Sequence, residues 1–285
     1  MITWTIYDLL FCLYALPGVM LANRRQIEGI REKKISFGKH PDQYLLLFEP
    51  EQKKRKNNFI FYLHGGGWWS FSPRKARFAG LSLASEGYIT ISAGYRLLPD
   101  FRYPTQIEDT FNGFNKALSL VDERYGKEKQ GVIMGTSAGG HLGGVLFCDR
   151  QRQKEYKIDH QRIKGFISHC GGINLKGCQK FLGKKLIDSF MGGSEDLQKA
   201  DPFLIMKNSK TIPDKPVLCI HGTKDPFWNY EMAQSFVDYI NEKANKNLAE
   251  LYTAEGKHHN DLTMELFLKD REAQKKLNDW LERLE

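Results

Sequence analysis

Ser137 is the residue whose surroundings point most clearly to chemistry. It lies within Gly135–Gly139, which reads Gly-Thr-Ser-Ala-Gly, directly after the apolar Val132–Met134. A β-branched run that enters a serine with glycines on both sides favours a sharp strand-to-helix turn with the hydroxyl at its apex. Neighbouring backbone comes too close in such a turn for a Cβ at the two glycine positions. The pattern therefore indicates a serine nucleophile, although in a glycine-rich chain it also occurs in ordinary loops.

The glycine run Gly65–Gly67 is the second chemical feature. It follows Phe59–Leu63, which has the pattern of a buried strand, so it lies at the edge where open α/β sheets place their sites. Backbone N–H groups of consecutive glycines can point to one spot and stabilise a developing oxyanion. The N–H groups of Gly66, Gly67 and Ala138 are therefore predicted to form an oxyanion hole.

An activated serine also needs a base within reach and a carboxylate that orients this base. Downstream of the serine, Asp225 follows the strand-like Val217–Ile220, and Asp201 is the alternative acid. The adjacent His258 and His259 are the two candidate bases. His64 is expected to brace the glycine run through its ring. The remaining histidines are interpreted as surface or structural residues: His40, His141, His160, His169 and His221.

The elements that must position these residues alternate between strand and helix. Apolar runs predict strands at Tyr44–Phe48, Phe59–Leu63, Tyr88–Ser92, Val132–Met134, Gly165–Ser168, Val217–Ile220 and Ala249–Tyr252. A helix is expected over Arg74–Glu86, and a second one where apolar side chains recur every three or four residues from Ile107 to Val121. This alternation predicts an α/β fold with a mostly parallel sheet and helices on both faces.

Several motifs together resemble a known family. They are His64–Trp68, Tyr95–Pro99 with Tyr103, Pro104 and Asp109, and Gly135–Leu142. In combination they resemble the hormone-sensitive-lipase and carboxylesterase branch of the α/β-hydrolase fold. The stretch from Phe37 to Pro50 looks most like the BD-FAE, kynurenine-formamidase and prenylcysteine-methylesterase subgroup. The resemblance runs from Phe37 to the C-terminus, but Thr136 stands where many lipase-like relatives carry Asp.

The resemblance implies an α/β-hydrolase whose acid is Asp225. In the family it resembles, the catalytic histidine usually lies three residues after a glycine and two before an acidic residue. His259 satisfies this spacing and His258 does not. The implied activity is hydrolysis of carboxylic esters with short to medium acyl groups through an acyl-enzyme, without a cofactor or metal. The alternatives are a formamidase acting on N-formylkynurenine-type amides, a prenylcysteine methylesterase at a membrane, and a hydrolase-fold protein that binds a ligand without turnover.

The 285 residues suit a single hydrolase domain, predicted at residues 37–285 with a lid insertion around 173–206. Residues 1–36 are predicted to be an apolar helical segment that caps the domain or associates with a membrane surface through residues 1–25. The apolar run from Leu9 to Ala22 is shorter than the roughly 20 residues that a membrane span needs. The positive charges of Arg24 and Arg25 follow this run instead of preceding it, unlike those of a secretory signal.

The charge and the cysteine content indicate which binding partners and which cellular compartment to expect. The net charge is +8, but the densest basic run, Lys53–Asn58, lies between two strand-like segments and is expected to be a solvated loop, not a nucleic-acid site. The 5 cysteines are irregularly spaced and predict reduced, mostly buried thiols of a cytoplasmic protein. Nothing in the sequence indicates an oligomeric state. Apolar side chains that could line a substrate pocket are Trp68, Trp69, Phe181, Leu182, Phe190, Phe203, Phe227 and Trp228.

Overall fold

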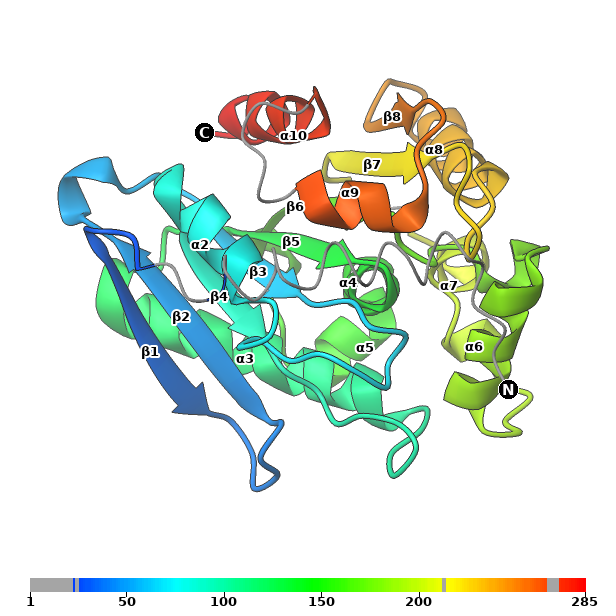
Figure 1. The fold of residues 1–285 in the computed structure, drawn as a ribbon, viewed down its shortest axis with the longest axis horizontal. Helices are drawn as coiled ribbons and strands as arrows, with labels where there is room; N and C mark the ends of the chain where they lie inside the picture. The colour runs from blue at the N-terminus through cyan, green and yellow to red at the C-terminus, as the bar shows by residue number, and fades with distance from the viewer. Residues whose placement is uncertain (1–22, 24–25, 212–213, 266–271) are drawn as a thin grey trace.

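The central feature of the computed structural model is an 8-stranded sheet with strand order β1-β2-β4-β3-β5-β6-β7-β8. The structure describes residue 23 and residues 26–211, 214–265 and 272–285 (Figure 1). Strands β1 and β2 are antiparallel to their neighbours, and the others run parallel. The strands are β1 Ile30–Ser36, β2 Tyr44–Pro50, β3 Phe59–Leu63, β4 Ile89–Ala93, β5 Gly131–Thr136, β6 Ile163–His169, β7 Val217–Gly222 and β8 Ala249–Ala254. The predicted α/β fold with a mostly parallel sheet is confirmed.

Helices cover both faces of the sheet (Figure 1), and on each face their apolar side chains pack against those of the strands. Alternate residues of β3 point to opposite faces, because successive side chains of a strand alternate. Phe61 joins the core under α3, α4 and α8, while Tyr62 joins the core under α2 and α10. The helices are α2 Arg77–Ser85, α3 Thr105–Tyr125, α4 Ala138–Cys148, α5 Arg150–Glu155, α6 Phe181–Met191, α7 Pro202–Asn208, α8 Glu231–Ala244, α9 His259–Glu265 and α10 Glu272–Glu282. Short 3-10 helices lie at Gln52–Lys54, His160–Arg162, Leu175–Gly177 and Leu197–Lys199.

The sheet begins earlier than the predicted domain start at residue 37. Residues Ile30–Ser36, which the sequence placed in the N-terminal helical segment, form the edge strand β1 and pair with β2. Four of its seven residues are charged, as is common for an edge strand that must avoid pairing with other chains. This charge hides the hydrophobic alternation by which a strand is identified in a sequence.

The apolar part of the N-terminal segment, residues 1–22, lies outside the described residues. Among the residues that the structure describes, no helix combines the length and the apolar character needed to cross a bilayer. The stretch predicted as a lid, residues 173–206, contains α6, the start of α7 and two 3-10 helices. The described cysteines are buried and unpaired: Cys148, Cys170, Cys178 and Cys219.

A buried ion pair fixes the loop that supports the glycine run. Asp109 is fully buried and accepts hydrogen bonds from the backbone N, Nε and Nη2 of Arg96 at 2.8–2.9 Å. Gln43 Nε2 donates to the same carboxylate at 2.7 Å. Next to the arginine, Tyr95 donates its hydroxyl to the carbonyl of His64 at 2.8 Å and stacks on that ring. The ion pair therefore holds the backbone on which the glycine run rests.

We expect Asp109→Asn to lower the free energy of unfolding by about 2–4 kcal/mol, because it leaves the donors of Arg96 and Gln43 without a charged acceptor. Urea denaturation measures the loss. The control is Asp122→Asn, which removes the more exposed pair with Arg162 and should cost less than about 1 kcal/mol. Equal midpoints for the Asp109 variant and the unmodified chain would contradict the proposed anchor.

Candidate active site

The turn at Ser137 joins β5 to α4 in a strained conformation. Its backbone φ of 54° and ψ of -118° is unfavourable for any residue but glycine, and the surrounding contacts hold it there. A Cβ on Gly139 would lie 2.1 Å from the carbonyl oxygen of Leu63, and one on Gly135 would lie 2.1 Å from the carbonyl oxygen of Gly139. The backbone N–H of Ser137 donates to the carbonyl of His169 at 2.9 Å. Both glycines are thus required by close approach, as the sequence pattern predicts.

Three side chains from distant parts of the chain meet at this turn. His259 Nε2 lies 2.9 Å from Ser137 Oγ, and His259 Nδ1 lies 2.6 Å from Asp225 Oδ2. Since a carboxylate only accepts, Nδ1–H donates to Asp225 and Nε2 is left to accept the serine proton. The serine comes from the turn before α4, the aspartate from the loop after β7, and the histidine from the first residue of α9. The geometry is that of a nucleophile, a base and an acid that orients the base.

The two alternative residues lie in other environments. The backbone N–H of His258 donates to Asp261 at 2.8 Å at the start of α9. Asp201 caps α7 by accepting from the backbone N–H of Phe203 and also accepts from that of Lys176, both at 2.8 Å. Burial raises the pKa of Asp201 to about 6, and hydrogen bonds from backbone N–H groups oppose this effect. The structure brings His259 and Asp225 to Ser137, and not the alternatives His258 and Asp201.

The buried pair of Asp225 and His259 stabilises its own charged form. Burial alone would lower the pKa of His259, but attraction to Asp225 and to Cys170 raises this pKa well above its usual value. For Asp225, burial acts to raise the pKa, but attraction to His259 and its hydrogen bond lower it below the usual value. Backbone N–H groups of Phe227 and Trp228 donate to Asp225 Oδ1 at 2.8 and 3.0 Å. The carboxylate therefore remains ionised beside the imidazole and favours its protonation.

The glycine run lies directly against the turn. A Cβ on Gly65 would be 3.2 Å from the Cβ of Ser137, so the two loops are in contact. Gly66 and Gly67 have φ values of 107° and 61°, which glycine adopts without strain. Ala138 is the first residue of α4, where a backbone N–H has no acceptor within the helix. These three N–H groups are the predicted donors to an oxyanion.

His64 supports this loop as the sequence suggests. Its Nδ1 lies 2.8 Å from the carbonyl oxygen of Gly65, and its ring stacks on Tyr95 with 4.3 Å between centroids. Burial lowers the pKa of His64 to about 4, so the ring stays neutral near pH 7. A neutral ring adds no charge to the oxyanion site.

Two further polar residues lie beside the catalytic loops. His221 lies at the end of β7, where its Nε2 donates to the carbonyl of Trp228 at 3.1 Å and lies 3.6 Å from Asp225 Oδ2. Its place four residues before Asp225 is a signal that the sequence offers, but its contact with the loop depends on the fold. Thr136, the departure from the lipase-like pattern, forms a hydrogen bond between its Oγ1 and the Tyr62 hydroxyl at 3.1 Å. The threonine hydroxyl is therefore satisfied in the core under the turn.

Apolar side chains surround the site, but not all of those predicted face it. Trp68, Phe190 and Trp228 are fully buried, with the first two stacked at 4.4 Å between centroids, and fill the space behind the glycine run. Trp69 and Leu186 approach Gly67, since both lie within 3.1 Å of a Cβ built there. Other predicted lining residues differ in place: Phe227 packs edge-on against the His259 ring, Phe203 packs on Phe236 and Tyr239, and Phe181 is exposed on the surface.

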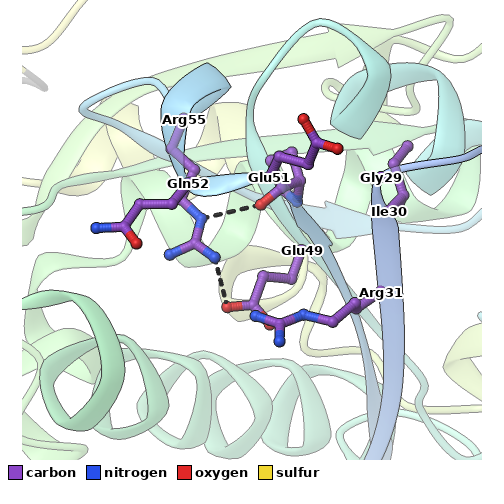
Figure 2. A pocket seen from close by; sticks show the side chains of 8 residues that line it. Gly29, Ile30, Arg31, Glu49, Glu51, Gln52 and Arg55 are labelled. Carbon is purple, nitrogen blue, oxygen red and sulfur yellow. Dashed lines mark hydrogen bonds and ion pairs between the residues drawn. The ribbon is translucent and has the colours of Figure 1, made fainter.

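A hollow at the sheet edge is unrelated to this site. It lies beside β1 and the end of β2, and Figure 2 shows Arg55 reaching toward Glu49 within it. Arg55 and Arg31 both pair with Glu49, at 2.9 and 3.1 Å, so the charges in the hollow are largely neutralised.

Within the described part of the chain, no cluster of three or more His, Cys, Asp or Glu could hold a metal ion.

Comparisons with known proteins agree with this fold. A curated rice protein named probable isoprenylcysteine alpha-carbonyl methylesterase is 23% identical over 245 residues, covering 82% of this chain and 59% of its own length. Esterase LipC of Mycobacterium tuberculosis is 25% identical over 229 residues, covering 74% of this chain and 55% of its own length. The chain thus spans between about half and three-fifths of the length of these relatives.

Solved structures give the same architecture. Esterase B of Lactobacillus rhamnosus superimposes with a TM-score of 0.71 at 18% identity, covering 95% of this chain and 90% of that structure. A truncated carbohydrate esterase from gut microbiota gives 0.73 at 15% identity, covering 90% and 98%. At these identities the likeness establishes the α/β-hydrolase fold. The BD-FAE family model matches residues 45–240, which run from within β2 into α8 and include Ser137 and Asp225, and the chain therefore belongs to the BD-FAE family.

Proposed function

We propose that this chain hydrolyses carboxylic esters with short to medium acyl groups through a covalent acyl-enzyme on Ser137. The observation that carries the proposal is the continuous hydrogen-bond path from Ser137 Oγ through His259 to Asp225, with contacts of 2.9 and 2.6 Å. Family membership and the esterases among the relatives support the same reaction class. The complete set of three residues argues against a hydrolase-fold protein that only binds a ligand.

The mechanism follows from this arrangement. His259 Nε2 takes the hydroxyl proton as Ser137 Oγ attacks the ester carbonyl, and Asp225 stabilises the resulting imidazolium. The N–H groups of Gly66, Gly67 and Ala138 donate to the oxyanion of the tetrahedral intermediate. The imidazolium then protonates the leaving alcohol as its bond to the carbonyl carbon breaks. A water molecule attacks the acyl-enzyme with His259 again as base, and the acid is released as Ser137 Oγ leaves and takes the proton back from His259. The steps use only side chains and backbone N–H groups of this chain together with water, and they need no metal or organic cofactor.

The surroundings of Gly67 favour an apolar substrate of limited length. Trp69 and Leu186 both approach the glycine, and the buried Trp68 and Phe190 close the space behind it. Ser137 itself is only 9% exposed. In our proposal the stretch 173–206, which carries Leu186, acts as the lid over the nucleophile.

Demethylation of a prenylated cysteine methyl ester is the second candidate. The curated rice relative is named for this reaction, and an apolar N-terminal segment suits a substrate that resides in a membrane. In this version residues 1–25 hold the protein on the cytoplasmic face of a membrane. Formamidase activity on N-formylkynurenine would use the same groups on an amide carbonyl. A panel of p-nitrophenyl esters, a farnesylcysteine methyl ester and N-formylkynurenine separates these substrates by their kcat/KM values.

We expect hydrolysis of p-nitrophenyl butyrate to fall by at least about a thousandfold in Ser137→Ala, because the nucleophile is lost and only oxyanion stabilisation remains. The assay is release of p-nitrophenol under saturating substrate. The control, Ser119→Ala, removes a hydroxyl that bonds only within α3 and should leave the rate unchanged. Full activity in the Ser137 variant would overturn the assignment of the nucleophile.

The pH dependence tests the role of Asp225. Activity requires neutral His259, so kcat/KM should decline as the pH falls below the pKa of this imidazole. In Asp225→Asn we expect kcat to drop by roughly 10³- to 10⁴-fold. The declining limb should also move to lower pH, since an amide no longer stabilises the imidazolium.

The control for this experiment is His258→Asn, which alters the neighbouring histidine and should preserve both the rate and the position of the limb. A limb that stays at the same pH in Asp225→Asn would show that this carboxylate does not act on the base.

A further inference from the structure

The exposed face of α6 combines an aromatic side chain with unpaired positive charge. Phe181 is 68% exposed, the highest value among the large hydrophobic side chains described, and Lys180, Lys184 and Lys185 around it are also exposed. Positions 181, 184 and 185 share one side of the helix because residues three and four apart are neighbours. Lys185 Nζ lies 5.4 Å from the Phe181 ring centroid. We call these four residues the basic aromatic face.

This charge differs from the denser basic run elsewhere in the chain. In that run Lys53 and Lys54 pair with Glu51 at 3.5 and 3.7 Å, and Lys56 pairs with Glu282 at 2.6 Å. By contrast, Lys184 and Lys185 form no ion pair with any residue that the structure describes. The two regions lie at opposite ends of the molecule (Figure 1). Positive charge is therefore available for an external anionic partner on α6.

The basic aromatic face adjoins the candidate active site. The buried side of α6 packs on both catalytic loops: a Cβ on Gly183 would lie 2.2 Å from the carbonyl oxygen of Phe227, and Leu186 approaches Gly67. Trp69, which follows the glycine run, is 51% exposed and is the other large hydrophobic side chain in the exposed class. Both exposed aromatics thus belong to segments that contact the site, although Ser137 is nearly closed to water.

We propose that the basic aromatic face, together with Trp69, docks on the surface of a bilayer that contains anionic phospholipid and presents a lipid-embedded ester to Ser137. Aromatic rings are favoured at the level of lipid headgroups, and lysines beside them are attracted to anionic lipids. An ester delivered from the bilayer would reach the nucleophile without exposing its apolar part to water. The inference rests on the proposed esterase function for the last step, but docking itself does not depend on catalysis.

Co-sedimentation of the full chain with vesicles tests docking without any need for activity. We expect binding to vesicles of phosphatidylcholine with 30% phosphatidylglycerol, which weakens as salt increases, and much weaker binding to pure phosphatidylcholine. The double variant Lys184→Glu, Lys185→Glu should lose at least about tenfold in partitioning, and Phe181→Ser should lose several-fold. The matched control is Lys53→Glu, Lys54→Glu, which makes the same charge change on another adjacent lysine pair and should stay within about threefold.

Several outcomes would overturn the proposal. Equal losses in the two double variants would mean that net charge alone drives binding, and full binding in the α6 variants would assign it to another part of the chain. A chain that ignores vesicles, but whose KM for a soluble carboxylate-bearing ester rises in the α6 double variant, would assign the lysines to an anionic substrate instead.

Hydrolysis of p-nitrophenyl butyrate in solution, measured on the same samples, keeps the two proposals apart. The α6 variants should retain this activity while losing hydrolysis of an ester embedded in the vesicles. Vesicle binding without hydrolysis of either ester would contradict the esterase function and leave docking supported.

Discussion

The close approach of backbone at the nucleophile turn is the constraint on which the site depends. Only because Gly139 carries no side chain can the start of α4 lie against the carbonyl oxygens of Leu63 and His64 at the end of β3. This contact places the turn after β5 beside the loop after β3, since the two strands are neighbours in the sheet. Oxyanion donors and nucleophile are thus set relative to each other by rigid backbone. The strain at Ser137 is stabilised by the packing of both segments.

The charge of Asp225 and its hydrogen bonds complete the site that the backbone positions. Asp225 is buried, yet it is ionised because two backbone N–H groups and His259 offset the cost of its burial. His221 donates a hydrogen bond to the carbonyl of Trp228 and so supports the same loop. The acid, the base and the serine come from the segments that follow β7, β8 and β5, at one edge of the sheet. In open α/β sheets, this edge is where the ends of the strands leave room for a site.

Much of this arrangement could be predicted from the sequence, because its signals are local. The glycines around Ser137 and the strand before them are consecutive in the chain, and the parallel sheet follows from alternating periodicity. Strand β1 could not be predicted in this way, since charged residues on an edge strand resemble a loop. The exposure of the aromatic side chains could not be predicted from the sequence either. Trp68 is fully buried because it stacks on Phe190 of α6, whereas the adjacent Trp69 is exposed. The contact of His221 with the acid loop likewise depends on the tertiary fold.

The central claim, that Ser137 is activated by its contact with His259, is tested most directly by locating a covalent adduct. The chain is treated with an equimolar fluorophosphonate, and the modified residue is mapped by mass spectrometry of its peptides. The account predicts a single adduct on Ser137 in the unmodified chain and little or none in His259→Asn, because the hydroxyl is a weak nucleophile without its base. An adduct on another residue, or equally rapid labelling of Ser137 without the histidine, would contradict it.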